Sequence, residues 1–545
     1  MRDTSHVDTF TAANEPADDL WPDISNASGL VNYPASLNAS VALLGEDQPR
    51  FDGDKTAVIA SDGTWSYESL LRSVTATASL LRRLGVQPGN RVLLRGLNTG
   101  WLTIAWLACL RVGAVAVTTV PLLRMRELDE ICDIAQPSLA IVDHRLTDEW
   151  SKVDFPGETL VFGDGSPGSL ESLVNDVDDD SCSHPTLAAD TAILAFTSGT
   201  TGRPKATMHS HRDLLAICDT YAAHILKPGP EDVFAGTPPL AFTFGLGGLL
   251  VFPLAFGATT VLLDKPDPTS LLAAIEGNEV TCLFTAPTGY RAMLREIDGY
   301  DTSSLRCCVS AGEALAQATS DDWFDKTGLR LIDGIGSTEM LHIFISNSVD
   351  EWRPGTLGRV VPGYSAMVVD EDMVRVPPNT PGQLAVKGVT GCRYLNDPRQ
   401  MNYVRDGWNV TGDIFTESED GFFRYVARSD DMIVSSGYNI AAPEVENALV
   451  THPSVQEVAV VGMPDDERGN IVTAFIVPTA DTTVDSSLAQ TLQEHVKNEI
   501  APYKYPRRIE FVDALPKTGS GKLQRSRLRD HPAANTKPNN GSARK

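Results

Sequence analysis

The stretch of sequence that decides the fold class is residues 192–205, which read AILAFTSGTTGRPK. Residues 192–196 are apolar and predict a buried strand, and a loop rich in glycine and hydroxyl side chains follows at once. Glycines let the backbone approach an anion, hydroxyls donate hydrogen bonds to phosphate oxygens, and a lysine adds positive charge. We therefore expect a phosphate-binding loop, with a surface turn as the alternative, made by Thr197, Ser198, Gly199, Thr200, Thr201, Gly202 and Lys205.

This loop differs from the two common nucleotide-binding motifs. A Walker A loop places Lys directly after its second glycine, whereas Arg203 and Pro204 intervene here. Residues 516–523 fail the same test, because Pro516 and Leu523 occupy the required Gly and Ser/Thr positions. The two Gly-x-Gly pairs, at residues 245–247 and 334–336, lack the third glycine of a dinucleotide fingerprint.

Outward from the loop, the pattern is that of an α/β protein. Over residues 91–142, apolar runs alternate with helical-period stretches, which predicts a parallel sheet with crossover helices. With the strand at 192–196, three further buried strands are expected at 280–284, 305–309 and 329–332, each ending in Gly, Ser, Thr or Asp. Ligands bind at such carboxyl ends in open α/β sheets. The expected architecture is a large N-terminal domain of parallel-rich sheets with flanking helices.

The sequence pattern changes near Arg428, and from Val455 onward short strands are expected to surround one amphipathic helix at residues 487–500. This pattern predicts a small α+β C-terminal domain. We expect residues 1–429 to form the large domain and 430–530 the small one. Disorder is expected over 1–19 and over the tail, 531–545, which is rich in Pro, Asn, Ser and Lys.

Composition argues against several partners and locations. A formal net charge of −26 repels phosphate backbones and anionic headgroups, so nucleic acid and membrane surfaces are disfavoured. The uncharged stretch 240–263 is interrupted by four glycines and a proline, and no signal peptide opens the chain. Eight scattered cysteines without CxxC indicate reduced thiols, so we expect a cytoplasmic protein.

Five motifs occur in a recognisable order. They are residues 197–205; 310–313 (SAGE); 333–339 (DGIGSTE); 411–413 (TGD) with Tyr425 and 428–431 (RSDD); and 516–522 (PKTGSGK). In this order the chain resembles the adenylate-forming superfamily of acyl-CoA synthetases, adenylation domains and beetle luciferases. The resemblance implies an AMP-forming acid–thiol ligase that activates a carboxylic acid with ATP and Mg²⁺, releases pyrophosphate and passes the acyl group to coenzyme A.

The resemblance also implies the nucleotide site. The adenine would slide between the backbone segments opened by Gly312 and Gly334, and Asp413 and Arg428 would bind the ribose. Glu339 is a hard oxygen ligand for Mg²⁺, and Thr338 would reach the α-phosphate. Taken singly, these carboxylates would be read as caps. The remaining nucleotide-binding residues implied are Ala311, Glu313, Asp333, Ile335, Gly336 and Tyr425.

Lys522 is the catalytic lysine that the resemblance implies. A carboxylate attacking the α-phosphorus brings two anions together, and a cation between them stabilises the transition state. Asp430 would be the hinge of a mobile small domain that later withdraws Lys522. The same movement would present Ser435, Ser436 and Gly437 to the arm of coenzyme A.

Aromatic and glycine residues alternate at 240–248 and 336–344, which suggests a flat slot for a planar ring. These stretches resemble benzoate-CoA and 2-aminobenzoate-CoA ligases. We therefore expect an aryl acid, 2-aminobenzoate first and benzoate second. His342 either hydrogen-bonds an ortho substituent or closes the pocket wall. The expected pocket residues are Ala241, Phe242, Thr243, Phe244, Gly245 and His342.

Three alternatives remain open from the sequence. A stand-alone adenylation enzyme would load an aryl acid onto a separate carrier protein, because no carrier-domain serine follows Lys522. A regulator without catalysis is disfavoured by the joint presence of Lys522, Glu339, Asp413 and Arg428. An oxidative, luciferase-like activity is compatible with the fold but has no separate support.

Overall fold

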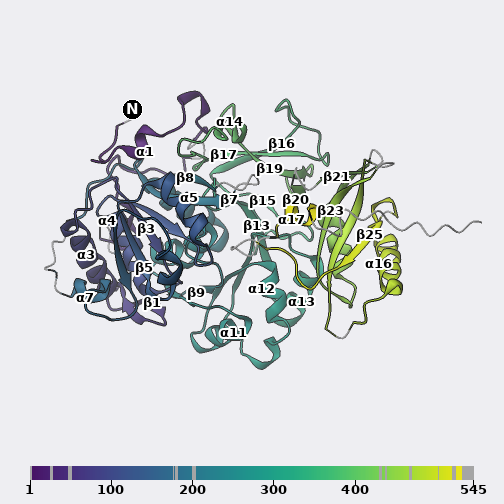
Figure 1. The fold of residues 1–545 in the computed structure, drawn as a ribbon, viewed down its shortest axis with the longest axis horizontal. Helices are drawn as coiled ribbons and strands as arrows, with labels where there is room; N and C mark the ends of the chain where they lie inside the picture. Colours follow the sequence, from purple (N-terminus) through teal and green to yellow (C-terminus); the bar gives the residue numbers. More distant parts are fainter. Residues whose placement is uncertain are drawn as a thin grey trace, which may run out of the picture. The chain divides into compact units, whose positions relative to one another are not determined.

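The computed structural model describes residues 3–24, 29–46, 52–175, 177, 182–198, 204–428, 432–435, 438–465, 469–480, 482–500, 502–517 and 523–530. The chain divides into two compact units (Figure 1). The first comprises Met1–Met367, Ala385–Thr411 and Ser418–Phe423; the second comprises Val368–Leu384, Gly412–Glu417 and Arg424–Lys545. The boundary expected at 429/430 stays a prediction, since residues 429–431 lie outside the described residues.

A six-stranded sheet of the first unit carries the phosphate-loop strand. Its order is β6-β5-β3-β4-β7-β8, and every neighbouring pair is parallel except β7 with β8. The alternation predicted over residues 91–142 is confirmed. The strands are β3 (Arg91–Arg95), β4 (Val115–Thr119), β5 (Leu139–Asp143), β6 (Glu158–Phe162), β7 (Thr191–Ser198) and β8 (Pro204–Ser210).

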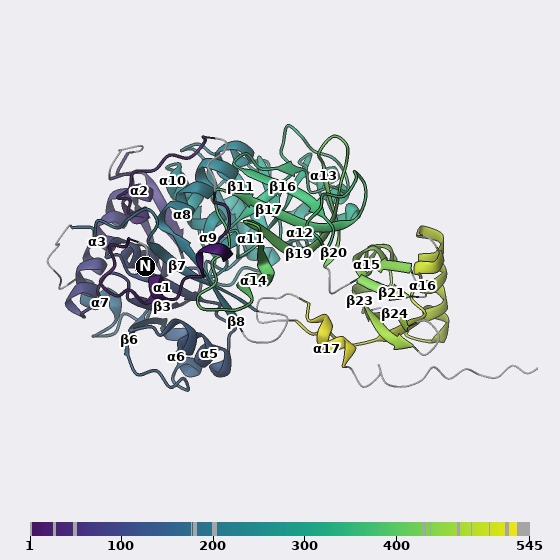
Figure 2. The same cartoon turned by 90° about the horizontal axis from the view of Figure 1, so that it is seen from above.

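Helices with polar caps and apolar stripes connect and cover these strands. The Thr99 side chain accepts a hydrogen bond from the Leu102 amide and so begins α4. Helix α5 buries Leu128, Ile131 and Ala135, at helical spacing, on one face of the sheet (Figure 2). The helices are α2 (Ala39–Leu43), α3 (Tyr67–Arg83), α4 (Gly100–Arg111), α5 (Met125–Ala135), η2 (His144–Leu146), α6 (Thr147–Trp150) and α7 (Leu170–Val174).

A nine-stranded sheet forms the rest of this unit's core. Its order is β15-β14-β13-β12-β11-β9-β10-β1-β2, parallel from β13 to β1 and antiparallel at both ends. The strands predicted near 280, 305 and 329 are confirmed as neighbours. The strands are β1 (Thr56–Ala60), β2 (Gly63–Ser66), β9 (Val233–Gly236), β10 (Thr259–Val261), β11 (Cys282–Thr285), β12 (Cys307–Ser310), β13 (Leu331–Gly336), β14 (Ile343–Ser346) and β15 (Arg359–Val360).

Buried side chains of α11, α12 and α13, including Leu272, Tyr290 and Trp323, pack on one face of β9, β11, β12 and β13. Packing rather than propensity therefore holds these short helices. The helical segments are α8 (His211–Ile217), η3 (Cys218–Leu226), α9 (Thr243–Leu246), η4 (Gly247–Val251), α10 (Phe252–Ala255), α11 (Pro268–Gly277), α12 (Pro287–Met293), η5 (Ile297–Gly299) and α13 (Gln317–Thr327).

A five-stranded sheet contributes residues to both units. Its order is β16-β17-β19-β18, with β20 paired to β19. Its elements are β16 (Tyr364–Val369), β17 (Gly382–Gly388), α14 (Gln400–Tyr403), β18 (Val404–Arg405), β19 (Trp408–Glu417) and β20 (Phe423–Arg428).

The second unit contains the small α+β arrangement expected from the sequence. Helices α15 and α16 pack on one face of β23 and β24, and Leu515 and Leu528 pack on the other. The elements are β21 (Met432–Ser435), β22 (Tyr438–Ala441), α15 (Ala442–Val450), β23 (Val455–Asp465), β24 (Gly469–Pro478), α16 (Ser486–Glu499), η7 (Pro502–Lys504), β25 (Arg508–Phe511) and α17 (Arg525–Arg529).

The disorder expected over residues 1–19 is wrong for the described part, residues 3–19. This segment forms α1 (Phe10–Ala13) and reaches η1 (Asp18–Leu20). The Ser5 hydroxyl donates to Asp190 at 2.6 Å, and the Arg91 guanidinium lies 4.3 Å from the centre of the Phe10 ring. These partners are distant in sequence, so composition alone could not reveal them. The tail, 531–545, lies outside the described residues.

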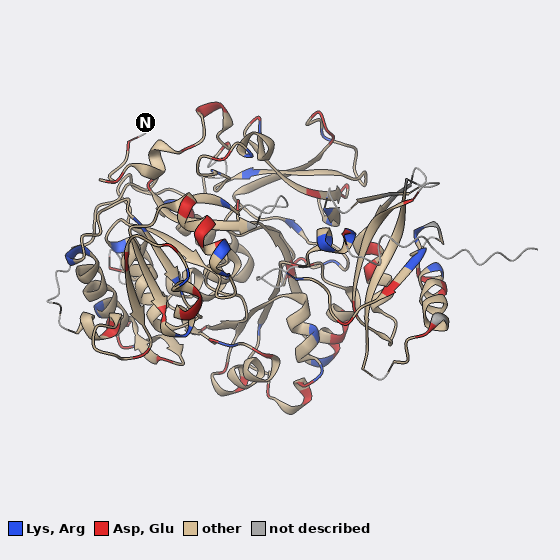
Figure 3. Cartoon of the chain, in the orientation of Figure 1, with Lys and Arg blue, Asp and Glu red and all other residues tan. Residues whose placement is uncertain are grey.

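Charged residues and apolar segments occupy different parts of the structure. Figure 3 shows most charged residues on helices and loops, while the strands of the two large sheets are mostly uncharged. Among the described helices, none is long and apolar enough to cross a membrane. The stretch at 240–263 instead forms α9, η4, α10 and β10. All eight cysteines are free thiols, and six of them are buried.

Candidate active site

The ends of the phosphate loop are held together by two paired strands. In the antiparallel pair β7–β8, Thr197 lies opposite Lys205 and Ser198 lies opposite Pro204. Strand pairing therefore fixes the position of the Lys205 backbone. The loop residues themselves lie outside the described residues: Gly199, Thr200, Thr201 and Gly202.

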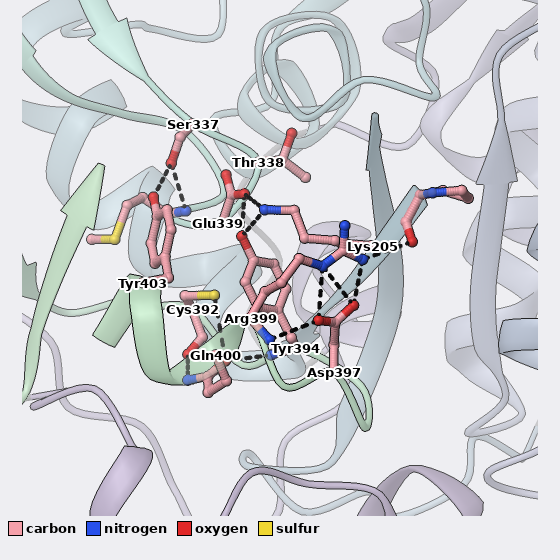
Figure 4. Close-up of polar contacts among 12 residues, drawn as sticks. Lys205, Ser337, Thr338, Glu339, Cys392, Tyr394, Asp397, Arg399, Gln400 and Tyr403 are labelled. Atoms are coloured by element: carbon pink, nitrogen blue, oxygen red, sulfur yellow. Dashed lines mark hydrogen bonds and ion pairs between the residues drawn. The ribbon is translucent and has the colours of Figure 1, made fainter. Parts of the chain in front are cut away.

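Lys205 meets Glu339 through a third residue, Tyr394 (Figure 4). The Lys205 Nζ donates to the Tyr394 hydroxyl at 2.7 Å, and that hydroxyl donates to Glu339 Oε1 at 2.5 Å. The direct separation of Lys205 Nζ and Glu339 Oε1 is 3.7 Å. Burial, with the Glu339 carboxylate beside it, holds the pKa of the Tyr394 phenol well above its ordinary value. The phenol therefore stays neutral and keeps its proton to donate.

A tight turn after β13 positions Thr338 and Glu339. The Met340 amide donates to both the carbonyl and the hydroxyl of Ser337, at 3.2 Å each. The His209 Nε2 donates to the Thr338 carbonyl at 2.7 Å. Burial lowers the pKa of His209 to about 4, so the ring is neutral and its single proton is on Nε2. His209 in β8 therefore helps to hold the turn that carries Thr338 and Glu339.

Glu339 fits a role in holding Mg²⁺. Its side chain is 11% exposed, Tyr394 occupies Oε1, and no described residue donates to Oε2. Among the described residues no group of three His, Cys, Asp or Glu side chains is arranged as a metal cage. A single carboxylate suits Mg²⁺, which is commonly bound by one or two carboxylates together with nucleotide phosphates.

The adenine wall expected from the sequence involves two glycines. Gly312 has φ +89° and open space at its missing side chain. At Gly334, a Cβ would lie 2.8 Å from Ile343 Cγ2, so the missing side chain lets β14 pack against β13. The opening for adenine at these two glycines stays a prediction. Ala311 and Glu313 follow β12, and Glu313 accepts a hydrogen bond from the Thr288 amide at 3.3 Å.

Asp333, Ile335 and Gly336 lie in β13 beside β14. A Cβ on Gly336 would lie 2.6 Å from the His342 carbonyl oxygen, so this glycine too serves close strand packing. Burial raises the pKa of Asp333 to about 8. Asp333 can therefore carry a proton near neutral pH and donate a hydrogen bond.

The pair predicted to bind the ribose lies in the second unit. Asp413 in β19 and Arg428 in β20 are joined by an ion pair of 3.2 Å. Tyr425 packs edge-on against Phe415, with ring centres 5.5 Å apart. The paired strands thus bring the three predicted residues together on one small sheet segment.

The predicted pocket residues gather around an apolar cluster in the first unit. Ala241, Phe242, Thr243, Phe244 and Gly245 lie at the beginning of α9 or just before it. The Phe244 ring lies 5.5 Å from Phe284 and 6.0 Å from His342, measured between ring centres.

His342 is buried at the centre of this cluster. Its ring lies 4.7 Å from Phe252 and 5.0 Å from Tyr221, and Gly247 approaches so closely that a Cβ there would lie 2.4 Å from the imidazole. Neither ring nitrogen makes a hydrogen bond of normal geometry with the described residues. Burial lowers its pKa to about 3, so the ring is neutral. The cluster therefore combines aromatic faces with polar atoms, on His342 and Tyr221, that lack a hydrogen-bond partner of normal geometry among the described residues.

The residues expected to serve the second half-reaction are only partly described. Ser435 ends β21 and is buried. Ser436, Gly437, the hinge residue Asp430 and Lys522 lie outside the described residues. On either side of residues 518–522, Lys517 and Leu523 form an antiparallel bridge, and the Gln524 amide donates to the Pro516 carbonyl at 2.8 Å.

Sequence reasoning missed Tyr394 and His209. The two partners of Tyr394 are 189 and 55 residues away, and His209 lies 129 residues from Thr338. No local periodicity marks either residue. A buried polar side chain in a strand, such as His209, is the one available signal, because such a group needs a partner.

Comparisons with known proteins agree with this geometry. Residues 45–393 match the AMP-binding enzyme family, and 444–522 match the AMP-binding enzyme C-terminal domain. The benzoate–CoA ligase of Thauera aromatica is 36% identical over 93% of this chain and 98% of its own length.

Two solved structures are similar throughout. An anthranilate CoA ligase in complex with anthranoyl-AMP has a TM-score of 0.86 and 32% identity, with coverage of 91% of this chain and 98% of its own. A benzoate CoA ligase from Burkholderia xenovorans LB400 has a TM-score of 0.83 and 33% identity, with coverage of 90% and 100%. The chain therefore belongs to the AMP-binding enzyme family, within the adenylate-forming superfamily, and is an AMP-forming acid–thiol ligase.

Proposed function

We propose that the protein is an ATP-dependent aryl-CoA ligase. It converts an aromatic carboxylic acid to the acyl-AMP with release of pyrophosphate, and then transfers the acyl group to coenzyme A. The observation that carries this proposal is a short segment that contributes residues to both the polar cluster and the aromatic cluster. Glu339, in the polar cluster with Lys205, and His342, in the aromatic cluster, are three residues apart in one turn. A carboxylate joined to a ring would suit such an arrangement.

The first half-reaction needs charge stabilisation. Lys205 and the loop hydroxyls would bind phosphate oxygens, Glu339 would hold Mg²⁺, and Thr338 would contact the α-phosphate. Asp413, Tyr425 and Arg428 would bind the sugar, and the backbone around Gly312 would flank the base. Lys522 would stabilise the charge that develops as the carboxylate attacks. When bound, Mg²⁺ would neutralise phosphate charge.

The acid proposed is 2-aminobenzoate, with benzoate second. A buried polar atom without a partner costs about 1–3 kcal/mol, and neither nitrogen of His342 has a hydrogen-bond partner of normal geometry among the described residues. An ortho amino or hydroxyl group beside the ring would supply the missing partner. The similarity to an anthranilate ligase supports this choice, while the relatives named for benzoate and 3-hydroxybenzoate support the wider aryl class.

Free coenzyme A is the proposed acceptor, with Asp430 as hinge and Ser435, Ser436 and Gly437 beside the thiol arm. Three relatives covered over nearly their whole length, two of them named for benzoate and one for 3-hydroxybenzoate, are named as CoA ligases. Transfer to a carrier protein is the alternative. Incubation with ATP, acid and micromolar free coenzyme A distinguishes the two, because only the ligase forms the thioester without a carrier.

The test of the acid class is a pyrophosphate-release screen over benzoate, 2-aminobenzoate, 2-hydroxybenzoate, cinnamate and medium-chain acids. We expect the highest kcat/KM for 2-aminobenzoate and the lowest values for the flexible chains, because a slot between aromatic faces does not order a chain. A medium-chain acid as the best substrate would contradict the aryl proposal. Benzoate as the best substrate would correct only the ring substituent.

The role of Lys522 is tested by separating the two half-reactions. Lys522→Ala should abolish adenylate formation and leave thioester formation from pre-made acyl-adenylate largely intact. Lys517→Ala is the matched control, because Lys517 already pairs with Glu457 at 2.7 Å. Equal loss of both half-reactions in the Lys522 variant would remove the assigned role.

A further inference from the structure

The segment of residues 390–403 contacts the turn that carries Glu339 through side-chain hydrogen bonds. The contacts involve three hydroxyl side chains of this segment and the turn residues 337–340; Figure 4 shows those of Tyr394 and Tyr403. They are Thr390 Oγ1 to the Met340 carbonyl at 2.8 Å, Tyr394 hydroxyl to Glu339 Oε1 at 2.5 Å, and Tyr403 hydroxyl with Ser337 Oγ at 3.3 Å. Of these three, only Tyr394 also reaches the phosphate-loop lysine.

The backbone on either side of Tyr394 is fastened to β8. The Met208 amide donates to the Arg393 carbonyl at 2.8 Å, and the Leu395 amide donates to the Ala206 carbonyl at 2.9 Å. Tyr394 itself forms an antiparallel bridge with Thr207. Its position is thus set by the same strand that begins with Lys205, so hydroxyl and ammonium are fixed in one frame.

The side chain before Tyr394 adds a second anchor. Arg393 donates to Asp213 at 2.8 Å, and the two side chains are 3% and 0% exposed. A buried, hydrogen-bonded ion pair of this kind is costly to separate. The Gln400 Oε1 accepts from the Tyr394 amide at 2.9 Å, and the Tyr394 and Tyr403 rings meet edge-on. The phenol therefore has little freedom to move away.

We propose that Tyr394 is a positioning residue of the ATP site, which holds the Lys205 ammonium and the Glu339 carboxylate apart and aimed before nucleotide binds. A separation of 3.7 Å between Lys205 Nζ and Glu339 Oε1 is too long for a hydrogen bond. A phenol has one proton to donate and lone pairs to accept, so a single hydroxyl satisfies both groups.

Without this hydroxyl, the ammonium and the carboxylate, which form an ion pair at 3.7 Å, would be free to close to hydrogen-bond distance. Such a contact would engage the charge that Lys205 offers to phosphate and the oxygen that Glu339 offers to Mg²⁺. With the hydroxyl in place, one ammonium proton and one carboxylate oxygen take part in hydrogen bonds with the described residues. A site arranged in advance avoids reorganisation when the nucleotide binds.

The test is Tyr394→Phe, which removes the hydroxyl and keeps the ring. This inference rests on the ATP site proposed above. The dissociation constant of Mg·ATP is measured by isothermal titration calorimetry on the full chain, without acid or coenzyme A. We expect it to rise about tenfold, by loss of a charge-assisted hydrogen-bond bridge. Thioester formation from pre-made acyl-adenylate should not change.

Tyr403→Phe is the matched control. It removes a hydroxyl from the same segment and the neighbouring ring, but this hydroxyl contacts Ser337 rather than Lys205 or Glu339. Its effect on the Mg·ATP dissociation constant should be much smaller. Equal effects of the two substitutions would show that any loss of a hydroxyl loosens the segment, and would overturn the specific role of Tyr394.

A second measurement separates the inference from the proposed site. In a Glu339→Gln background, Tyr394→Phe should weaken Mg·ATP binding much less than in the wild type, since the hydroxyl acts through that carboxylate. Full additivity overturns the inference, as does loss of the folded state in Tyr394→Phe, seen by thermal melting. If Glu339→Gln alone leaves Mg·ATP binding unchanged, the proposed site itself is wrong. If it weakens binding and Tyr394→Phe does not, only the inference fails.

Discussion

The two ends of the turn at residues 336–344 differ in the way they use buried polar groups. At the phosphate end, Lys205, Tyr394 and Glu339 form a continuous chain of hydrogen bonds. At the acid end, His342 is enclosed by aromatic rings and its nitrogens have no partner of normal geometry among the described residues. One end is satisfied before ligand binds, and the other is left unsatisfied.

From this difference we infer that the two ends contribute to different properties of the enzyme. A satisfied charged network presents fixed charges to any nucleotide, which suits a step common to every acid. An unsatisfied polar atom in an apolar wall rewards a ligand that supplies its partner and penalises one that does not. The phosphate end is therefore expected to control rate, and the acid end to control which acid is used.

The largest effect should come from the phosphate end. Glu339→Gln keeps the shape but removes the negative charge, so adenylate formation should fall about 10²–10³-fold for every acid. The measurement is the pyrophosphate-release rate with saturating acid. A loss confined to one acid would show that the turn does not divide into two ends as described.

At the acid end, His342→Leu should change preference rather than overall rate. The ratio of kcat/KM for 2-aminobenzoate to kcat/KM for benzoate should fall by a factor equivalent to about 1–3 kcal/mol. This is the value of a buried hydrogen bond that is no longer formed. The same ratio in Glu339→Gln serves as the control and should stay at its wild-type value. If His342→Leu leaves the ratio unchanged, the histidine closes the wall and does not contact the substituent.

Phe244→Ala tests the packing of the ring independently of its substituent. Binding of both benzoate and 2-aminobenzoate should weaken by about 1–3 kcal/mol, because the ring of either acid loses its contact with the Phe244 ring. The affinity for Mg·ATP, measured by calorimetry, should not change. An unaltered KM for every aryl acid would place the pocket elsewhere.

The smallest expected effect is on stability at acid pH. Burial lowers the pKa of His342 to about 3, while an unfolded histidine titrates near 6.5. Below about pH 6.5 the unfolded chain binds the extra proton, so the free energy of unfolding falls as pH falls. Between pH 7.5 and 5.5, His342→Leu should lose about 1 kcal/mol less stability than wild type in urea unfolding. Identical losses would mean that the imidazole is hydrated in the folded protein.

The local motifs were readable because each is a short run of residues with a strong backbone preference. The buried strand before Thr197, the strands near 280, 305 and 329, and the small α+β unit all follow from apolar patterning. The ordered N-terminal segment was not predicted, because its anchors, such as Asp190 for Ser5, are 185 residues away. At Gly334 the structure adds a packing role that the sequence did not reveal, since a glycine in a strand permits either ligand access or strand packing.

The sequence by itself determined the α/β class, the phosphate loop and the order of motifs that marks an AMP-forming ligase. Only the tertiary structure decided that Tyr394 stands between Lys205 and Glu339, and that His342 is buried among aromatic rings without a hydrogen-bond partner of normal geometry in the described part of the chain. The physical reason is that strand and turn preferences act over a few residues, whereas these contacts form only when sheets and long connections close around them.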